Sequence, residues 1–110
     1  FFFAKHKMTA FVELLGEDLV CGTETVNTAD ALQGKVVGLY FSAHWCPPCR
    51  EFTPKLAEWY NKSLQAQGME VVLVSSDGDE AAFEDHLSEQ PWKALPFADR
   101  DRKAALCRQF

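Results

Sequence analysis

Two short stretches of the chain, residues 36–41 and 71–74, are apolar throughout. Continuous apolar runs of this length are typical of strands that are covered on both faces, as in a parallel sheet. The segment between them has helical periodicity, because its apolar positions recur at steps of three and four: Phe52, Leu56, Trp59 (or Tyr60) and Leu64. The pattern predicts a strand, a helix and a second, parallel strand, joined by a right-handed crossover.

We expect the crossover helix to run to about Gln67, because Gly68 supplies the residue that commonly follows a helix C-terminus. Pro54 lies inside this segment. It lacks an amide donor, so it should kink the helix or weaken its first turns.

The C-terminal third predicts two more helices. Asp77 and Glu80 have the spacing of a capping box at the start of the first one, and Pro91 ends it. Residues 92–97 then form a connecting loop or a short strand, and residues 100–110 are expected to be helical.

The N-terminal third is predicted to contain a small antiparallel hairpin. Its strands would be residues 11–15 and 18–26, on either side of Gly16-Glu17. Residues 28–34 are expected to form a turn or a single helical turn, which Gly34 closes.

The N-terminus itself, residues 1–7, is interpreted as a leader or a cloning remnant, because Met8 could be the natural start. Residues 1–3 are all Phe, which is too short a run for the apolar core of a signal peptide. Three apolar residues without alternation also predict a poor strand. Residues 8–110 are then expected to form a single domain, since 110 residues in all suit one hydrophobic core.

Composition narrows the class of protein. The net charge of −5 and the lack of a basic run argue against nucleic acid as the main partner. No apolar stretch approaches the roughly 20 residues that a membrane span needs. The chain has four cysteines and no recognisable export signal. This combination favours a reducing compartment, the cytoplasm or alternatively the mitochondrion, where disulfides are catalytic rather than structural.

The most informative motif is Trp45-Cys46-Pro47-Pro48-Cys49, which directly follows the first predicted strand and precedes the crossover helix. A Cys-x-x-Cys at a helix N-terminus is typical of a redox dithiol. The first Cys would cap the helix and the second would lie in its first turn. The free amides and the dipole at this helix end should stabilise the thiolate of Cys46. The carboxyl end of a strand is also where open α/β sheets place their sites.

The alternative interpretation of such a motif is half of a zinc site. A structural zinc site needs four ligands, and the other candidates have no second pair with ligand spacing: Cys21, Cys107, His6, His44 and His86. Two prolines between the cysteines also make a stiff turn. We therefore expect redox chemistry and no bound metal or organic cofactor.

Residues 40–56, with the sequence YFSAHWCPPCREFTPKL, resemble the tryparedoxin and nucleoredoxin branch of the thioredoxin superfamily. Residues 74–80 (VSSDGDE) and 90–97 (QPWKALPF) match the same branch, so the resemblance covers about residues 11–110. Ordinary thioredoxins carry Gly-Pro rather than Pro-Pro between the cysteines. The resemblance implies an α/β thioredoxin-like fold, with a central sheet built on the βαβ unit and flanked by helices.

The chain departs from the thioredoxin pattern at two places. The family's fold continues past the position of Phe110 with a cis-proline loop, two antiparallel strands and a final helix, and this half is missing from the sequence. Its loss is expected to expose a sheet edge through which copies of the chain could associate. Tyr40 stands where thioredoxins carry a buried acidic proton-transfer residue; tryparedoxin-like proteins are similar to this chain in that respect.

Cys46 is predicted to be the attacking nucleophile, and Cys49 the residue that resolves the mixed disulfide. His44 and Arg50 could lower the pKa of the thiol, or could be exposed flanking residues. Trp45 is interpreted as a flat wall for partner docking, as the resemblance implies, or as local packing that supports the turn.

Other candidate residues have plainer expected roles. Pro47 and Pro48 stiffen the turn and remove two amides beside the sulfurs, which should raise the pKa of the thiol somewhat. Asp77 is expected to cap a helix, with an approach to the dithiol as the second option. The remaining side chains are predicted to be reduced buried thiols (Cys21, Cys107), a solvated imidazole (His86), and core or loop packing (Trp59, Trp92).

The leading hypothesis is a tryparedoxin-type thiol-disulfide oxidoreductase. By resemblance, a small dithiol such as trypanothione would reduce the Cys46–Cys49 disulfide, and the electrons would pass to peroxiredoxin-like or other disulfide proteins. One alternative is a nucleoredoxin-like reductase served by a flavoprotein reductase or glutathione. The other is a redox-sensitive binding module without efficient turnover.

Overall fold

A computed structural model describes residues 2–4 and 8–109 of the chain. In this part of the chain the strands form one six-stranded sheet in the order β1-β4-β5-β6-β2-β3. Neighbours β4, β5 and β6 run parallel, and the other pairings are antiparallel. The strands are β1 (Phe2–Ala4), β2 (Asp18–Cys21), β3 (Glu24–Asn27), β4 (Val36–Ser42), β5 (Met69–Ser75) and β6 (Lys93–Ala94).

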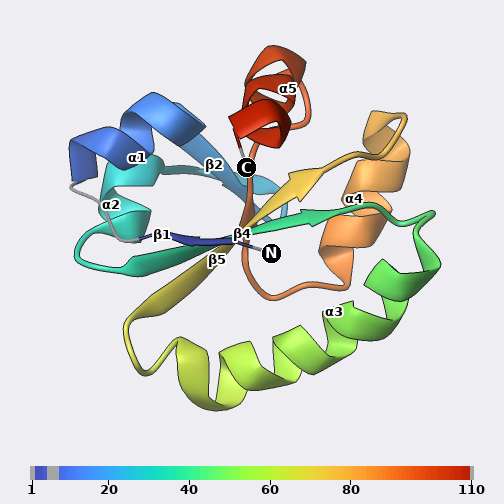
Figure 1. The fold of residues 1–110 in the computed structure, drawn as a ribbon, viewed down its shortest axis with the longest axis horizontal. Helices are drawn as coiled ribbons and strands as arrows, with labels where there is room; N and C mark the ends of the chain where they lie inside the picture. The colour runs from blue at the N-terminus through green and yellow to red at the C-terminus, as the bar shows by residue number, and fades with distance from the viewer. Residues whose placement is uncertain (1, 5–7, 110) are drawn as a thin grey trace.

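Strands β4 and β5 form the centre of the molecule, with helices on both faces of the sheet (Figure 1). They are paired in parallel from Val36 opposite Met69 to Ser42 opposite Ser75, as the two apolar runs predicted. Alternate side chains enter two separate cores. One core lies under α1 (Met8–Leu15), α2 (Thr28–Leu32) and α5 (Arg100–Gln109); the other lies under α3 (Pro47–Trp59) and α4 (Glu80–Ser88). The α/β fold class and the βαβ unit are confirmed.

The crossover helix is nearly as expected. Helix α3 contains Pro54 and passes directly into a π-helical turn, η1 (Tyr60–Leu64). The chain then turns at Gly68, whose φ of 82° lies in the left-handed region that favours glycine. Tyr60 rather than Trp59 is the core residue: Tyr60 is 2% exposed and Trp59 is 58% exposed. The expectation that Trp59 packs in the core was therefore wrong, whereas Trp92 is buried as predicted.

The predicted N-terminal hairpin was wrong in its first strand. Residues 8–15 form helix α1, and the hairpin lies further along, between β2 and β3. Phe11 and Leu15 are both buried and stand four residues apart, which puts them on one face of a helix. Gly16 ends α1 with a φ of 82° and donates from its amide to the carbonyl oxygen of Val12 (2.8 Å).

The N-terminal segment also differs from expectation, because Phe2–Ala4 is a strand although its apolar run without alternation predicted a poor one. It pairs antiparallel with β4, with Phe2 opposite Leu39 and Ala4 opposite Val37. Backbone pairing at a sheet edge needs free amides and carbonyls, and it does not need alternating side chains. Residues 1 and 5–7 lie outside the described part of the chain. Self-association through this edge of β4, which stays a prediction, would have to displace β1.

The short elements are mostly as predicted. Helix α2 begins after Asn27, whose side chain accepts from the Asp30 amide (3.1 Å), and a left-handed Gly34 follows it. Residues 93–94 form the short strand β6, and α5 covers the predicted C-terminal helix. The cap of α4 was assigned to the wrong residue, since Asp79 rather than Asp77 accepts from a helix amide, that of Ala82 (2.8 Å). No helix in the described residues is long and apolar enough to cross a membrane.

Candidate active site

The two cysteines of the motif lie where the carboxyl end of β4 leads into α3, on the right-hand side of the molecule in Figure 1. Cys46 is the N-cap residue of α3, with extended backbone, and its carbonyl accepts from the Arg50 amide (3.0 Å). Cys49 lies in the first turn of the helix. The placement expected from the motif is confirmed: one sulfur stands at the helix end and the other lies deeper behind it.

The thiols of Cys46 and Cys49 interact directly. The hydrogen bond with Cys49 raises the pKa of the Cys46 thiol. Burial acts to raise the pKa of Cys49, but hydrogen bonds with Cys46, the Ser42 hydroxyl and the Ala43 backbone outweigh it and lower that pKa. The expected lowering at Cys46 is therefore wrong for the reduced dithiol. The two thiols therefore titrate as a pair, and Cys46 remains the more accessible of the two.

Asp77 holds the loop that leads to the dithiol. Its carboxylate is 4% exposed and accepts from the His44 amide (2.8 Å) and from the Ser75 hydroxyl (2.6 Å). Since Asp77 follows β5 and His44 follows β4, this carboxylate joins the ends of the two central strands. The second option for Asp77, an approach to the dithiol itself, stays a prediction; the structure shows its carboxylate bonded to the loop that leads there.

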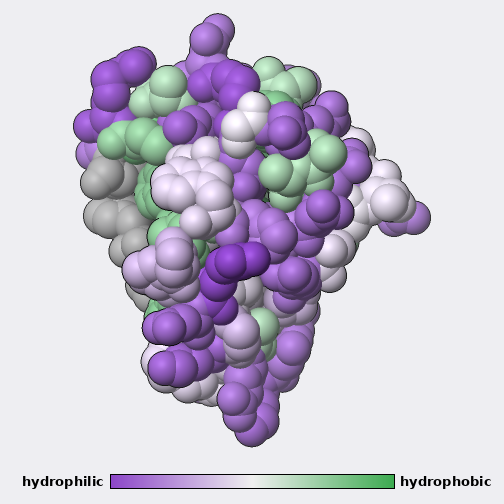
Figure 2. Space-filling model, turned by 90° about the vertical axis from the view of Figure 1, so that its right-hand side faces the viewer, coloured by the Kyte–Doolittle hydropathy of each residue, from purple (hydrophilic) through white to green (hydrophobic). Residues whose placement is uncertain are grey.

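Trp45 projects from the surface beside the dithiol and is 67% exposed. Its indole nitrogen donates to the Ser76 carbonyl (3.3 Å), which fixes the ring against the end of β5. A hollow of about 200 Å³ opens next to it; it is lined by Phe41, Ser42, Ala43, Trp45, Cys46, Cys49 and Ser76. The face of the molecule that carries this end of the sheet combines hydrophilic areas with apolar patches (Figure 2). A partner could therefore reach both sulfurs alongside an aromatic wall.

Tyr40 lies on β4 and joins this strand to the first turn of α3. The side chain is buried, and its hydroxyl is hydrogen-bonded to the hydroxyl of Thr53 (2.6 Å). It also donates to the carbonyl oxygen of Cys49 (3.3 Å), which accepts from Thr53 as well (2.8 Å). These bonds tie the first turn of α3 to β4, and they reach the backbone of Cys49 rather than its sulfur.

Four further residues flank the dithiol in the sequence. Pro47 and Pro48 occupy the first positions of α3, where a missing amide costs little, and both are exposed. Arg50 is also exposed. His44 is half-buried, and its Nε2 lies 3.8 Å from a carboxylate oxygen of Glu89.

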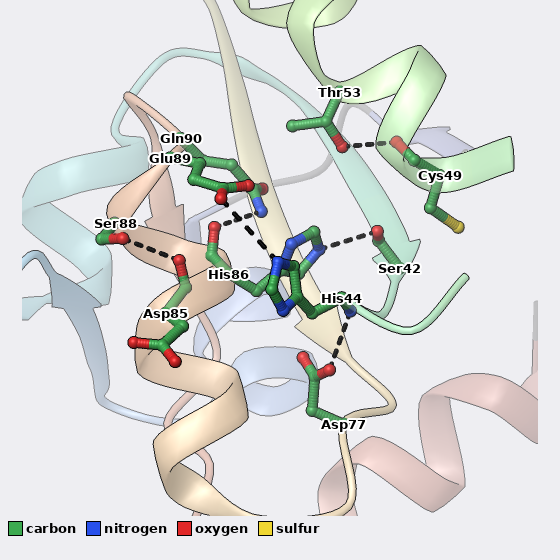
Figure 3. A network of polar contacts seen from close by, with 10 residues as sticks. All are labelled: Ser42, His44, Cys49, Thr53, Asp77, Asp85, His86, Ser88, Glu89 and Gln90. Atoms are coloured by element: carbon green, nitrogen blue, oxygen red, sulfur yellow. Dashed lines mark hydrogen bonds and ion pairs between the residues drawn. The ribbon is translucent and has the colours of Figure 1, made fainter. Parts of the chain in front are cut away.

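Sequence reasoning missed two polar residues behind the dithiol, namely Ser42 and His86. His86 was expected to be solvated, yet it is 1% exposed, and its Nε2 is hydrogen-bonded to Ser42 Oγ (2.9 Å). Figure 3 shows this pair between α4 and the end of β4. The signal that could have found His86 is its spacing from Phe83 and Leu87, which places all three on the buried face of α4.

The two remaining cysteines are not part of the site. Both are free thiols, with Cys21 half-buried and Cys107 exposed, so the prediction that they are buried was wrong. Cys107 lies on the solvent side of α5, whereas Leu106 provides its buried contact. Among the described residues no cluster of His, Cys, Asp or Glu side chains has the arrangement of a metal site.

Comparison with known proteins gives a consistent result. A family model described as thioredoxin-like matches residues 34–110. Tryparedoxin of Trypanosoma brucei brucei is 52% identical over 80 residues, which are 73% of this chain and 56% of that protein. Probable nucleoredoxin 1 of Arabidopsis thaliana is 50% identical over 80 residues, 72% of this chain but only 14% of that protein. The chain therefore spans between about one seventh and just over half of the length of these two relatives.

Among solved structures, tryparedoxin II of C. fasciculata superposes with a TM-score of 0.88 at 36% identity, over 96% of this chain and 70% of that one. A second structure of tryparedoxin II contains glutathionylspermidine; it has a TM-score of 0.81 at 38% identity, over 84% of this chain and 65% of that one. Sequence and fold comparisons thus point to the same group of proteins.

Proposed function

The chain belongs to the thioredoxin-like family, and from this premise we propose that it is a thiol-disulfide oxidoreductase of the tryparedoxin and nucleoredoxin branch. The single observation that supports this activity best is the arrangement of the dithiol. Cys46 is accessible at the N-terminus of α3, and the Cys49 thiol is hydrogen-bonded to it from the first turn. The Cys46 sulfur can then attack a partner disulfide, and the Cys49 sulfur is close enough to form a disulfide with Cys46 afterwards.

The reaction follows from this arrangement. The Cys46 thiolate attacks one sulfur of a partner disulfide, forming a mixed disulfide and displacing the other partner sulfur as a thiolate. The Cys49 thiolate then attacks Cys46 Sγ, which forms the Cys46–Cys49 disulfide and releases the second partner sulfur. Two electrons have passed from the dithiol to the partner. The hollow beside Trp45 leaves room for the approaching disulfide.

We further propose that a small dithiol of the trypanothione type returns electrons to the Cys46–Cys49 disulfide, and that peroxiredoxin-like or other disulfide proteins accept them. The tryparedoxin II structure with glutathionylspermidine, a small thiol conjugate, supports the donor class. The cycle needs no metal and no organic cofactor beyond the dithiol. It suits a reducing compartment such as the cytoplasm.

A nucleoredoxin-like reductase with a different donor is the second candidate, and the 50% identity to a nucleoredoxin favours it. Stopped-flow tryptophan fluorescence of the oxidised chain separates the two, because Trp45 lies beside the disulfide. Trypanothione, glutathione and a thioredoxin reductase system would be compared as reductants. Rapid reduction by trypanothione alone supports the tryparedoxin-type donor; rapid reduction by one of the others instead supports the nucleoredoxin-type donor.

The chemical assignment is tested by serine substitutions. Cys46→Ser should abolish reduction of insulin disulfides, whereas Cys49→Ser should accumulate a mixed disulfide with the substrate. The matched control is Cys107→Ser, which removes an exposed thiol on α5 away from the dithiol. Full activity of the Cys46→Ser protein would contradict the proposed function.

A further inference from the structure

A row of polar side chains leads from the sulfur of Cys49 into the interior of the protein. Ser42 and Cys49 line the same hollow, and the Ser42 hydroxyl lowers the pKa of the Cys49 thiol. The same hydroxyl lies 2.9 Å from His86 Nε2. Ser42 is the last residue of β4, His86 lies on the buried face of α4, and Figure 3 shows the bond between them; Cys49 comes from a third element, α3. Ser42 and His86 are 4% and 1% exposed, which separates this route from bulk water.

Other polar groups near the dithiol are already engaged elsewhere. The Tyr40 hydroxyl bonds the Cys49 backbone and Thr53. The two carboxylate oxygens of Asp77 accept from the His44 amide and the Ser75 hydroxyl. His86 Nδ1, in contrast, has no hydrogen-bond partner among the described residues. An imidazole with one bonded and one unbonded nitrogen is therefore the group to which the thiol is connected.

We propose that Ser42 and His86 form a proton relay that deprotonates Cys49 when the mixed disulfide is resolved. The proposal rests on the proposed function, because it concerns the second step of that reaction. His86 acts through Ser42 and is a positioning and proton-accepting residue, since it does not touch the reacting sulfurs.

The proton balance is simple. The Cys49 thiol gives its proton to Ser42 Oγ, and the Ser42 hydroxyl gives its own proton to His86 Nε2, leaving a thiolate and an imidazolium. The thiolate then attacks Cys46 Sγ and the partner sulfur leaves with the electron pair of the broken bond. The imidazolium returns its proton by the same route to the leaving thiolate or to solvent. Neutral thiol and neutral imidazole are thus converted into an ion pair without any net uptake of protons.

The surroundings of His86 are consistent with a base that is neutral in the resting protein. Burial lowers its pKa, the nearby Asp77 carboxylate opposes this, the His44 ring lowers the pKa further, and the Glu89 carboxylate raises it. The His44 and His86 rings lie 5.7 Å apart between centroids. A neutral imidazole can accept a proton at once, and the carboxylates of Asp77 and Glu89 favour the imidazolium that forms.

The relay predicts a distinctive pH profile. When His86 takes the proton of Cys49, no proton is exchanged with solvent. The population of the reactive ion pair then does not depend on pH between the ionisation of His86 and that of Cys49. The resolution rate should then be nearly flat between about pH 6.5 and 8. Without the relay the rate follows the thiolate fraction of a thiol with a pKa near 8.5, and rises about tenfold per pH unit.

The test uses the full chain with Cys21→Ser and Cys107→Ser, so that only the dithiol reacts with Ellman's reagent. A first release of thionitrobenzoate reports attack by Cys46, and a second reports resolution by Cys49. His86→Gln keeps a hydrogen-bonding group near Ser42 but cannot be protonated, and Ser42→Ala removes the connecting hydroxyl. We expect both to slow the second release by about tenfold or more at pH 6.5 and by less than about twofold at pH 9. The matched control is Ser88→Ala, an exposed hydroxyl on the same helix.

The outcomes distinguish this proposal from the one on which it rests. A normal first release with a second release that keeps its flat pH profile in either variant would overturn the relay alone. A missing first release in the parent protein would overturn the proposed function together with the relay. Because Ser42→Ala leaves the buried imidazole in place, the test still stands if His86→Gln fails to fold.

Discussion

Asp77→Ala is expected to destabilise the protein much more than Asp79→Ala, although the two residues are close neighbours in sequence. Asp77 accepts two hydrogen bonds while 4% exposed, from the His44 amide and the Ser75 hydroxyl. Asp79 is exposed and accepts one, from the Ala82 amide at the start of α4. The comparison tests which of the two carboxylates caps the helix and which holds the active-site loop.

The magnitudes can be worked from these contacts. A hydrogen bond to a charged group contributes about 1.5–3 kcal/mol, so the loss of two of them should cost about 3 kcal/mol or more. Loss of an N-cap costs about 1 kcal/mol. With a urea m-value of about 1.5 kcal/mol per molar, the unfolding midpoint should fall by about 2 M for Asp77→Ala and by about 0.7 M for Asp79→Ala.

The assay is equilibrium unfolding in urea at pH 7.5, followed by tryptophan fluorescence and by circular dichroism. Asp77→Asn is the graded variant, because an amide oxygen can still accept from His44 without the charge; it should lose about half as much as Asp77→Ala. Amide hydrogen exchange at His44 should become faster in Asp77→Ala and stay unchanged in Asp79→Ala. If Asp77→Ala costs no more than Asp79→Ala, the assignment of Asp77 to the loop is refuted.

Three further predictions concern the support of the dithiol. Tyr40→Phe should lose about 1 kcal/mol of unfolding free energy, because it removes the hydroxyl bonded to Thr53, and should leave the pH profile of resolution unchanged; a changed profile would contradict a purely structural role. Leu56→Ala should lower the free energy of unfolding by about 2–5 kcal/mol, because Leu56 is 2% exposed, whereas Trp59→Ala should lower it by less than about 1 kcal/mol. Equal losses of the two variants in urea unfolding would contradict the assignment of Leu56 to the core. Burial holds the pKa of His86 below its ordinary value, so the folded protein binds that proton less readily than the unfolded chain does. The contribution of His86 to the free energy of unfolding is therefore fully present above about pH 6.5 and is lost as the pH falls through the folded pKa. Between pH 7.5 and 5, His86→Gln should lose less unfolding free energy than the parent protein. Equal losses in the two proteins would argue against a lowered pKa of His86.

Local patterns were enough to predict the centre of this protein. The two apolar runs specified buried parallel strands, because a strand covered on both faces needs apolar residues at every position. The periodic segment between them, ended by Gly68, specified the crossover helix, and the Cys-x-x-Cys at its start placed two thiols at the N-terminus of that helix, where we propose redox chemistry. All of these signals lie within one element or at its boundary.

Errors arose where a residue's partner is distant in sequence. Phe11 and Leu15 fit a strand or a helix, and packing on the sheet decided for the helix. The role of Asp77 depends on the His44 amide, 33 residues away, and the hydrogen bond of His86 depends on Ser42, 44 residues away.

Sequence alone therefore determined that this chain builds a βαβ unit with a dithiol at the carboxyl end of its first strand. Only the tertiary structure decided what surrounds the second sulfur. Hydrogen bonds between side chains of different elements depend on how those elements pack, and the packing is not encoded in any local pattern. For that reason the motif was enough to propose Cys46 and Cys49 as the reacting residues. The bond from the His44 amide to Asp77 and the bond between Ser42 and His86 became visible only in the packed structure.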